Sequence, residues 1–156
     1  MDACDAVFSA TYALNEQIAR AVFEALPDGG PVVAIMDGEG HSWVSDAAAF
    51  ARVNLAEPFL DDLCAAVDDG IEPVTVRAGE TSVTVTQLTT EQTHCGYLVL
   101  VTPRPDERTS AVERDLVEAL LGQILLAANL IEARCLLSDT QVRCYGAYGS
   151  GGALVN

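Results

Sequence analysis

The sequence contains no lysine. All eight basic residues are arginines, and they stand against 23 acidic residues, so the formal net charge is −15. A surface this acidic repels DNA, RNA and anionic membranes, and no basic stripe along the chain offsets the charge. We therefore expect no nucleic-acid partner and no membrane partner.

Membrane-spanning and secretory patterns are also missing. No stretch approaches 18 uninterrupted apolar residues, and Asp2 and Asp5 follow Met1 without the basic and apolar regions of a signal peptide. The cysteines are odd in number and irregularly spaced, which predicts reduced thiols in the cytoplasm rather than a disulfide framework. They are Cys4, Cys64, Cys95, Cys135 and Cys144.

Motifs of catalysis and metal binding are absent as well. The chain has no P-loop, no dinucleotide fingerprint, no G-x-S-x-G, and no C-x-x-C or H-x-x-H spacing. The pair His94-Cys95 is interpreted as a hydrogen-bonded loop histidine beside a half-buried thiol. We expect no catalytic residue and no metal site, and we expect that the protein is not an enzyme. The sequence does not indicate which cofactor, if any, the protein binds.

Half of the 156 residues are hydrophobic, which is enough for one domain with a substantial core. Apolar periodicity and turn signals predict an α+β fold: a five-stranded antiparallel sheet flanked by an N-terminal helix, a short helix and a long C-terminal helix. In the N-terminal helix, Asn15, Glu16 and Arg20 are placed on the polar side. The predicted helices span 5–26 and 58–68, the predicted strands span 32–36, 41–45, 74–77, 82–88 and 96–102, and 46–54 is either a loop or one helical turn.

The longest predicted helix begins at a capping box, Ser110 with Glu113, and runs to about Arg134. Its apolar residues cover well over half of its circumference, more than one sheet-facing stripe requires. The excess predicts a homodimer in which a second copy of the helix is the partner. The expected interface residues are Leu116, Leu120, Ile124 and Ile131.

The predicted domain spans 1–135. Glycines at 146, 149, 151 and 152 predict a flexible tail over 136–156.

The order of these elements resembles that of profilin-like domains, a group that includes GAF, PAS and roadblock-like domains. The likeness to a GAF domain lies in residues 31–46 (PVVAIMDGEGHSWVSD), which resemble the opening hairpin, and in 96–133, which resemble the closing strand and signalling helix. This resemblance implies a ligand pocket between the sheet and its short helix, and dimerisation through terminal helices that pass on a signal.

Two functions follow as hypotheses. The first is a cytoplasmic regulatory or sensory domain that binds a small molecule and signals through its dimerising C-terminal helix. The ligand contacts expected for it are Trp43, Thr84, Thr86 and Tyr97, since pockets combine apolar walls with a few polar groups. The second is a scaffold of roadblock or profilin type that binds no ligand and only associates with other proteins.

Overall fold

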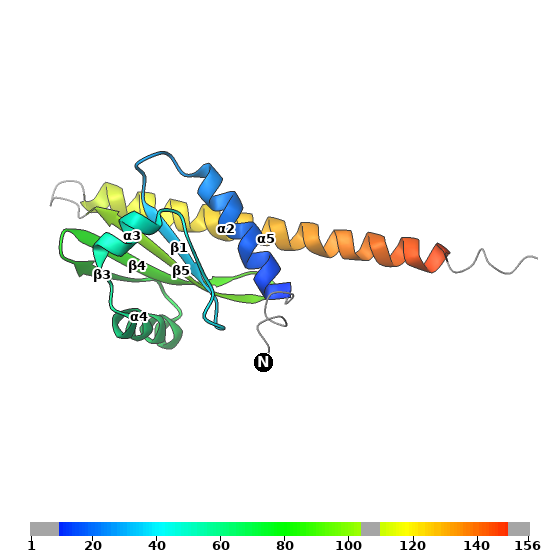
Figure 1. Ribbon diagram of the computed structural model, residues 1–156, viewed down its shortest axis with the longest axis horizontal. Coiled ribbons are helices and arrows are strands. Elements are labelled where there is room, and N and C mark those ends of the chain that lie inside the picture. The colour runs from blue at the N-terminus through cyan, green and yellow to red at the C-terminus, as the bar shows by residue number, and fades with distance from the viewer. Residues whose placement is uncertain (1–9, 104–109, 150–156) are drawn as a thin grey trace, which may run out of the picture.

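The computed structural model describes residues 10–103 and 110–149, and within them the side chains of 10–103 and 111–139. It confirms the predicted α+β architecture (Figure 1). The helices are α2 (Ala10–Ala25), α3 (Ala47–Val53), α4 (Glu57–Gly70) and α5 (Ser110–Gly149). The strands are β1 (Val32–Met36), β2 (Ser42–Val44), β3 (Val74–Ala78), β4 (Thr81–Thr89) and β5 (His94–Pro103).

The five strands form one sheet in the order β2-β1-β5-β4-β3, with every neighbouring pair antiparallel. The apolar strand β5 lies in the middle, as its sequence predicts, because a strand covered on both faces needs apolar side chains on both. It pairs with β1 through Ala34 opposite Val99, and with β4 through Val85 opposite Val99.

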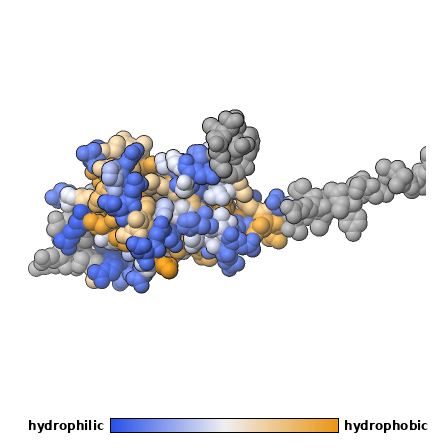
Figure 2. Space-filling view, turned by 90° about the horizontal axis from the view of Figure 1, so that it is seen from below, coloured by the Kyte–Doolittle hydropathy of each residue, from blue (hydrophilic) through white to orange (hydrophobic). Residues whose placement is uncertain are grey.

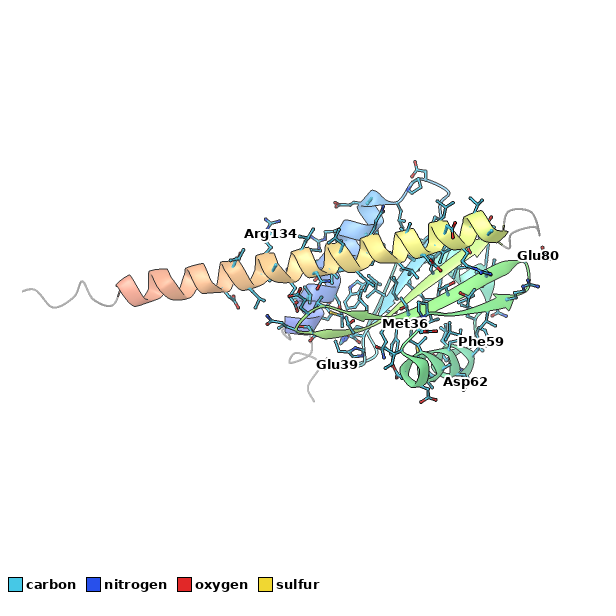
Figure 3. The ribbon with its side chains drawn as sticks, turned by 180° about the vertical axis from the view of Figure 1, so that it is seen from behind. Met36, Glu39, Phe59, Asp62, Glu80 and Arg134 are labelled. Carbon is cyan, nitrogen blue, oxygen red and sulfur yellow. The ribbon has the colours of Figure 1, made fainter. Side chains whose placement is uncertain are left out.

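Helices cover both faces of the sheet, and each layer has its own core. On one face, α2 and α5 pack against β1, β5 and the end of β4, around Ile18, Ile35, Leu98 and Leu100. On the other face, α4 packs through Leu60, Leu63 and Val67 on the valines of β4 and β5, with Phe59 beside them (Figure 3). The strand alternation predicted for β4 is confirmed, because Val83 and Val85 belong to this second core.

The segment that the sequence left open, 46–54, is the short helix α3. Asp46 caps its start by accepting a hydrogen bond from the Ala49 amide at 2.8 Å, and Asn54 ends it in the left-handed conformation. Both residue types favour these positions, because their short polar side chains satisfy the free backbone groups of a helix end.

Two expectations about the helices are wrong. Asn15 does not lie on the polar side of α2: it is fully buried, and its side-chain amide donates to the Cys95 carbonyl at 2.8 Å. Helix α5 does not end near Arg134 but continues to Gly149, so 136–149 is helical rather than a flexible tail. The stretch 136–145 contains neither glycine nor proline, and the glycines that suggested a tail come after it.

Some predicted features lie outside the described residues. These are the start of the first helix over residues 5–9, the side chain of Ser110 in the capping box, and residues 150–156 of the tail.

A β-bulge at the start of β5 fixes the pairing of the central strands. Leu88 lies opposite Gly96 and Thr89 opposite His94, which leaves Cys95 as the extra residue. Gly96 has φ +119°, and a Cβ atom added there would lie 2.1 Å from the Met36 carbonyl oxygen. Only glycine fits this position.

Replacement of Gly96 by alanine is therefore expected to lower the free energy of unfolding by about 3 kcal/mol or more, because both the backbone and a neighbouring strand must shift. Chemical denaturation followed by circular dichroism measures this loss. Gly38→Ala is the matched control, since an added Cβ there meets nothing within 4 Å. Equal midpoints for the two variants would show that the strands accommodate the extra atom.

Helix α4 ends on a residue poorly suited to its conformation. Ile71 has φ +59° and ψ +14°, and its side chain is 81% exposed. The left-handed conformation costs a β-branched residue roughly 1–2 kcal/mol, and glycine avoids this cost.

Ile71→Gly is expected to stabilise the protein by about 0.5–1 kcal/mol, after the greater chain entropy of glycine in the unfolded state is subtracted. A thermal melt at fixed protein concentration measures the gain, with Ile71→Ala as the control that keeps a Cβ. A lower melting temperature for the glycine variant would mean that the Ile71 side chain makes stabilising contacts.

Candidate interaction surface

The four residues predicted to contact a ligand do not share one site. Trp43 packs with the α2–α5 core, whereas Tyr97 packs with the α4 core on the opposite face of the sheet. Thr84 and Thr86 are buried and alternate with Val83 and Val85, so they face the α2–α5 side, on a strand separated from the β2 strand of Trp43 by β1 and β5. The structure therefore divides these residues between two layers.

The polar atoms of two of these residues are bound within the protein. The Thr84 hydroxyl lies 2.9 Å from the Thr75 hydroxyl, and the Tyr97 hydroxyl donates to Asp68 at 2.6 Å. The Gln87 amide donates to the other oxygen of Asp68 at 2.8 Å. These contacts lower the pKa of Asp68, and its carboxylate raises the pKa of Tyr97 to about 12.

The space expected to hold a ligand, between α4 and the sheet, is occupied by the second core. Leu60, Leu63 and Val67 of α4 are buried there against β4 and β5. This packing stabilises the helix on the sheet.

Asp37, Glu39 and His41 in the β1–β2 hairpin have ligand-type atoms within 4.8 Å of one another. One oxygen of Asp37 accepts hydrogen bonds from the backbone amides of Glu39 and His41, and the other lies 2.8 Å from His41 Nδ1. The Asp37 carboxylate is thus already used to hold the turn. The His41 ring packs edge-on against Tyr12 at 5.1 Å.

The cysteines whose side chains the structure describes are Cys64, Cys95 and Cys135, and all are free. Burial raises the pKa of the Cys95 thiol to about 11, and burial together with Asp61 and Asp68 raises that of Cys64. Both thiols are therefore protonated at neutral pH and poorly nucleophilic. Cys95 is fully buried rather than half-buried, because the bulge turns it into the core.

Helix α5 carries two separate apolar faces. The inner face lies on the sheet and α2, and Leu121, Ile124 and Ala128 are buried in that core. Val117, Leu120, Leu125 and Ile131 pack partly against the same core. The opposite face is exposed although much of it is apolar.

This result changes the set of residues predicted for the dimer. Ile124 is only 3% exposed and belongs to the domain core, so its assignment to a dimer interface is wrong. Leu120 and Ile131 are half-buried on the same side, and only Leu116, at 63% exposure, lies on the outer face. Periodicity alone could not separate the two faces, because almost every turn of the helix carries leucine or isoleucine.

The outer face has a regular pattern that the sequence reasoning missed. Its residues are separated by alternating intervals of four and three, which is the heptad spacing of coiled-coil helices. We call this set the outer seam, and all of its members are exposed: Val112, Leu116, Ala119, Gln123, Leu126, Leu130, Ala133 and Leu137. A search of the helix sequence for apolar residues at alternating intervals of four and three could have found this seam.

Helix α5 is also much longer than the sheet that it covers, and its C-terminal part extends away from the domain (Figure 1). Hydrophobic surface is visible on the last described part of this helix, next to the grey residues (Figure 2). Leu126, Leu130 and Leu137 of the outer seam are 61–66% exposed. Exposed leucines in a row are unusual for a protein surface and are typical of a binding site for another protein.

The segment Ala111–Asp139 is long and apolar enough to cross a membrane by length and composition. The inner face of the same segment forms part of the domain core through Leu121, Ile124 and Ala128. The apolar part of the segment also contains Glu118 and Glu132, and charged side chains are costly inside a lipid core.

Polar contacts hold α5 at a fixed rotation on the domain. The Thr90 hydroxyl donates to Glu132 at 2.5 Å, and the Asn129 side chain accepts from the Glu91 amide at 3.0 Å. Glu132 is buried, and the hydrogen bond from Thr90 lowers its pKa. These contacts join the β4–β5 turn to the inner face of α5, so that the outer seam is kept outward.

Comparison with protein-family models, with curated proteins and with solved structures finds no match to this chain. The likeness to a GAF domain therefore stays a prediction. The feature of the molecule that bears on function is the geometry of α5.

Loss of the Thr90 hydroxyl tests the role of this anchor. Thr90→Val is expected to lower the free energy of unfolding at pH 7 by about 1–3 kcal/mol, because buried Glu132 loses a partner. The folded-state pKa of Glu132 is lowered, so its stabilising effect is present above the unfolded pKa of about 4.3 and is lost as pH falls through the folded value.

The deficit of Thr90→Val should therefore shrink as pH falls below about 4. Urea denaturation between pH 3 and pH 7 measures it. Glu132→Gln, which removes the charge but keeps the shape, should also lose this pH dependence. A deficit of the same size at every pH would contradict the assigned role of the carboxylate.

Proposed function

We propose that this protein is a non-catalytic interaction module that associates with a second copy of itself through the outer seam of α5. The observation that supports this proposal is the row of exposed leucines in heptad spacing, held outward by the buried face of the same helix. Each seam side chain then lies in position to insert between side chains of a facing helix.

The sensory function is the less supported of the two hypotheses. A ligand pocket built from Trp43 and Tyr97 requires both side chains on one face of the sheet, and they lie on opposite faces. The scaffold hypothesis needs no shared cavity. It needs an exposed apolar surface of defined geometry, which the outer seam provides.

We also propose that the module acts in the cytoplasm. Support comes from Cys64, Cys95 and Cys135, which are free thiols in the described structure.

The double variant Leu126→Glu with Leu130→Glu tests self-association. Four new charges would be buried in each dimer, so the dissociation constant should rise about 100-fold or more. Multi-angle light scattering should show the monomer mass of 16.4 kDa for the variant and twice that mass for the unchanged protein. Circular dichroism should show an intact fold, since both leucines are more than 60% exposed within one chain.

Ile71→Glu is the matched control, because it also replaces an exposed apolar residue by a carboxylate. Ile71 lies at the end of α4, on the face of the sheet opposite α5. This control variant should remain a dimer. A monomer mass for the unchanged protein at concentrations well above micromolar would refute self-association. Ile124→Glu is unsuitable for this test, because it would place a charge in the domain core.

A further inference from the structure

We infer that the two copies pair with their α5 helices antiparallel, about a two-fold axis that passes between Gln123 and Leu126. This inference rests on the proposed function, since it specifies the geometry of the same self-association. In this register each seam residue meets another seam residue of the second copy. The layers are Val112 with Leu137, Leu116 with Ala133, Ala119 with Leu130, and Gln123 with Leu126, each occurring twice.

The sizes of the seam residues favour this register. Both alanines of the seam, Ala119 and Ala133, lie opposite leucines of the second copy. Facing helices interdigitate best when large side chains meet small ones, because the space between the helices is then filled evenly. Because intervals of four and three alternate, any heptad seam lines up with a reversed copy of itself. The spacing alone does not place alanines opposite leucines, so that match is an additional feature of this sequence.

A parallel pair would use the same seam less well. Each residue would then face its own copy, so that alanine would meet alanine at 119, between the Leu116 and Gln123 layers, and at 133, between the Leu130 and Leu137 layers. Those two layers would leave voids, and voids in an interface lose packing energy. The favourable feature of the parallel pair is Gln123 beside Gln123, where two amides can form hydrogen bonds.

Charges beside the seam also favour the antiparallel pair. Glu113 and Arg134 each follow directly after a seam residue, Val112 and Ala133, and therefore lie on the same flank of the helix. Arg134 is exposed and points away from the sheet (Figure 3). In antiparallel helices this flank of one copy faces the same flank of the other, so Glu113 comes near Arg134 of the second copy, twice per dimer.

The position of the sheets is compatible with this arrangement. Each sheet lies against the inner face of its own α5, opposite the outer seam. Two seams can therefore meet with both sheets on the outside. The end of α5 that extends beyond one domain would then lie along the beginning of α5 in the other copy, and both would lose exposed apolar surface.

Charge reversal tests the contact between Glu113 and Arg134. Glu113→Arg and Arg134→Glu should each weaken the dimer about tenfold, because each replaces two attractive contacts by two repulsive ones. The double variant should restore the dissociation constant of the unchanged protein, measured by analytical ultracentrifugation at low salt. Absence of rescue in the double variant would overturn the antiparallel register, since a parallel pair places Arg134 beside Asn129.

A distance measurement separates this inference from the proposed function. A spin label carried by a non-canonical amino acid at position 139 leaves the native cysteines unchanged. Antiparallel pairing predicts about 45 Å between the two labels, from a helical rise of about 1.5 Å per residue. Parallel pairing predicts less than about 20 Å, because the helices are 8–10 Å apart.

The outcomes of this measurement are distinct. A distance near 45 Å supports the inference. A short distance in a protein of dimer mass overturns the antiparallel register and leaves self-association standing. The absence of any dipolar signal, together with a monomer mass, overturns both proposals.

Discussion

The buried stripe of Leu121, Ile124 and Ala128 sets the rotation of α5 on the sheet, and the proposed function depends on that rotation. If the helix turned by half a revolution about its axis, leucines of the outer seam would enter the core and core residues would face solvent. The hydrophobic effect does not by itself choose between these rotations, because both faces are apolar. The polar contacts of Glu132 with Thr90 and of Asn129 with Glu91 choose one, since buried or half-buried polar atoms need specific partners.

The same layer contains a second polar anchor, on α2. Asn15 is fully buried and donates to the Cys95 carbonyl at the β-bulge, while its own side-chain oxygen has no hydrogen-bond partner among the described residues. The bulge in turn requires Gly96, because a side chain there would collide with β1. The N-terminal helix, the central strand and the neighbouring edge of the sheet are thus positioned by one local irregularity.

The acidic composition of the chain is compatible with the proposed self-association. A chain with a net charge of −15 repels a second copy of itself over most of its surface. The outer seam is mainly apolar, and the arginine on its flank, Arg134, is placed to meet an acidic residue of the other copy. In the proposed dimer, this pair of opposite charges favours the antiparallel register over arrangements that bring acidic side chains together.

The sequence by itself determined the α+β class, the central position of β5 and the existence of a long, unusually apolar C-terminal helix. These features follow from local periodicity and turn chemistry, which operate over a few residues. It could not decide which apolar face of α5 is buried, that Asn15 points inward, or that the candidate ligand residues lie on both sides of the sheet. Those outcomes depend on contacts between residues far apart in the chain, such as Asn15 with Cys95 and Thr90 with Glu132. Only the tertiary structure brings such residues together, and it is the tertiary structure that turns an apolar helix into one with a core face and an outer seam.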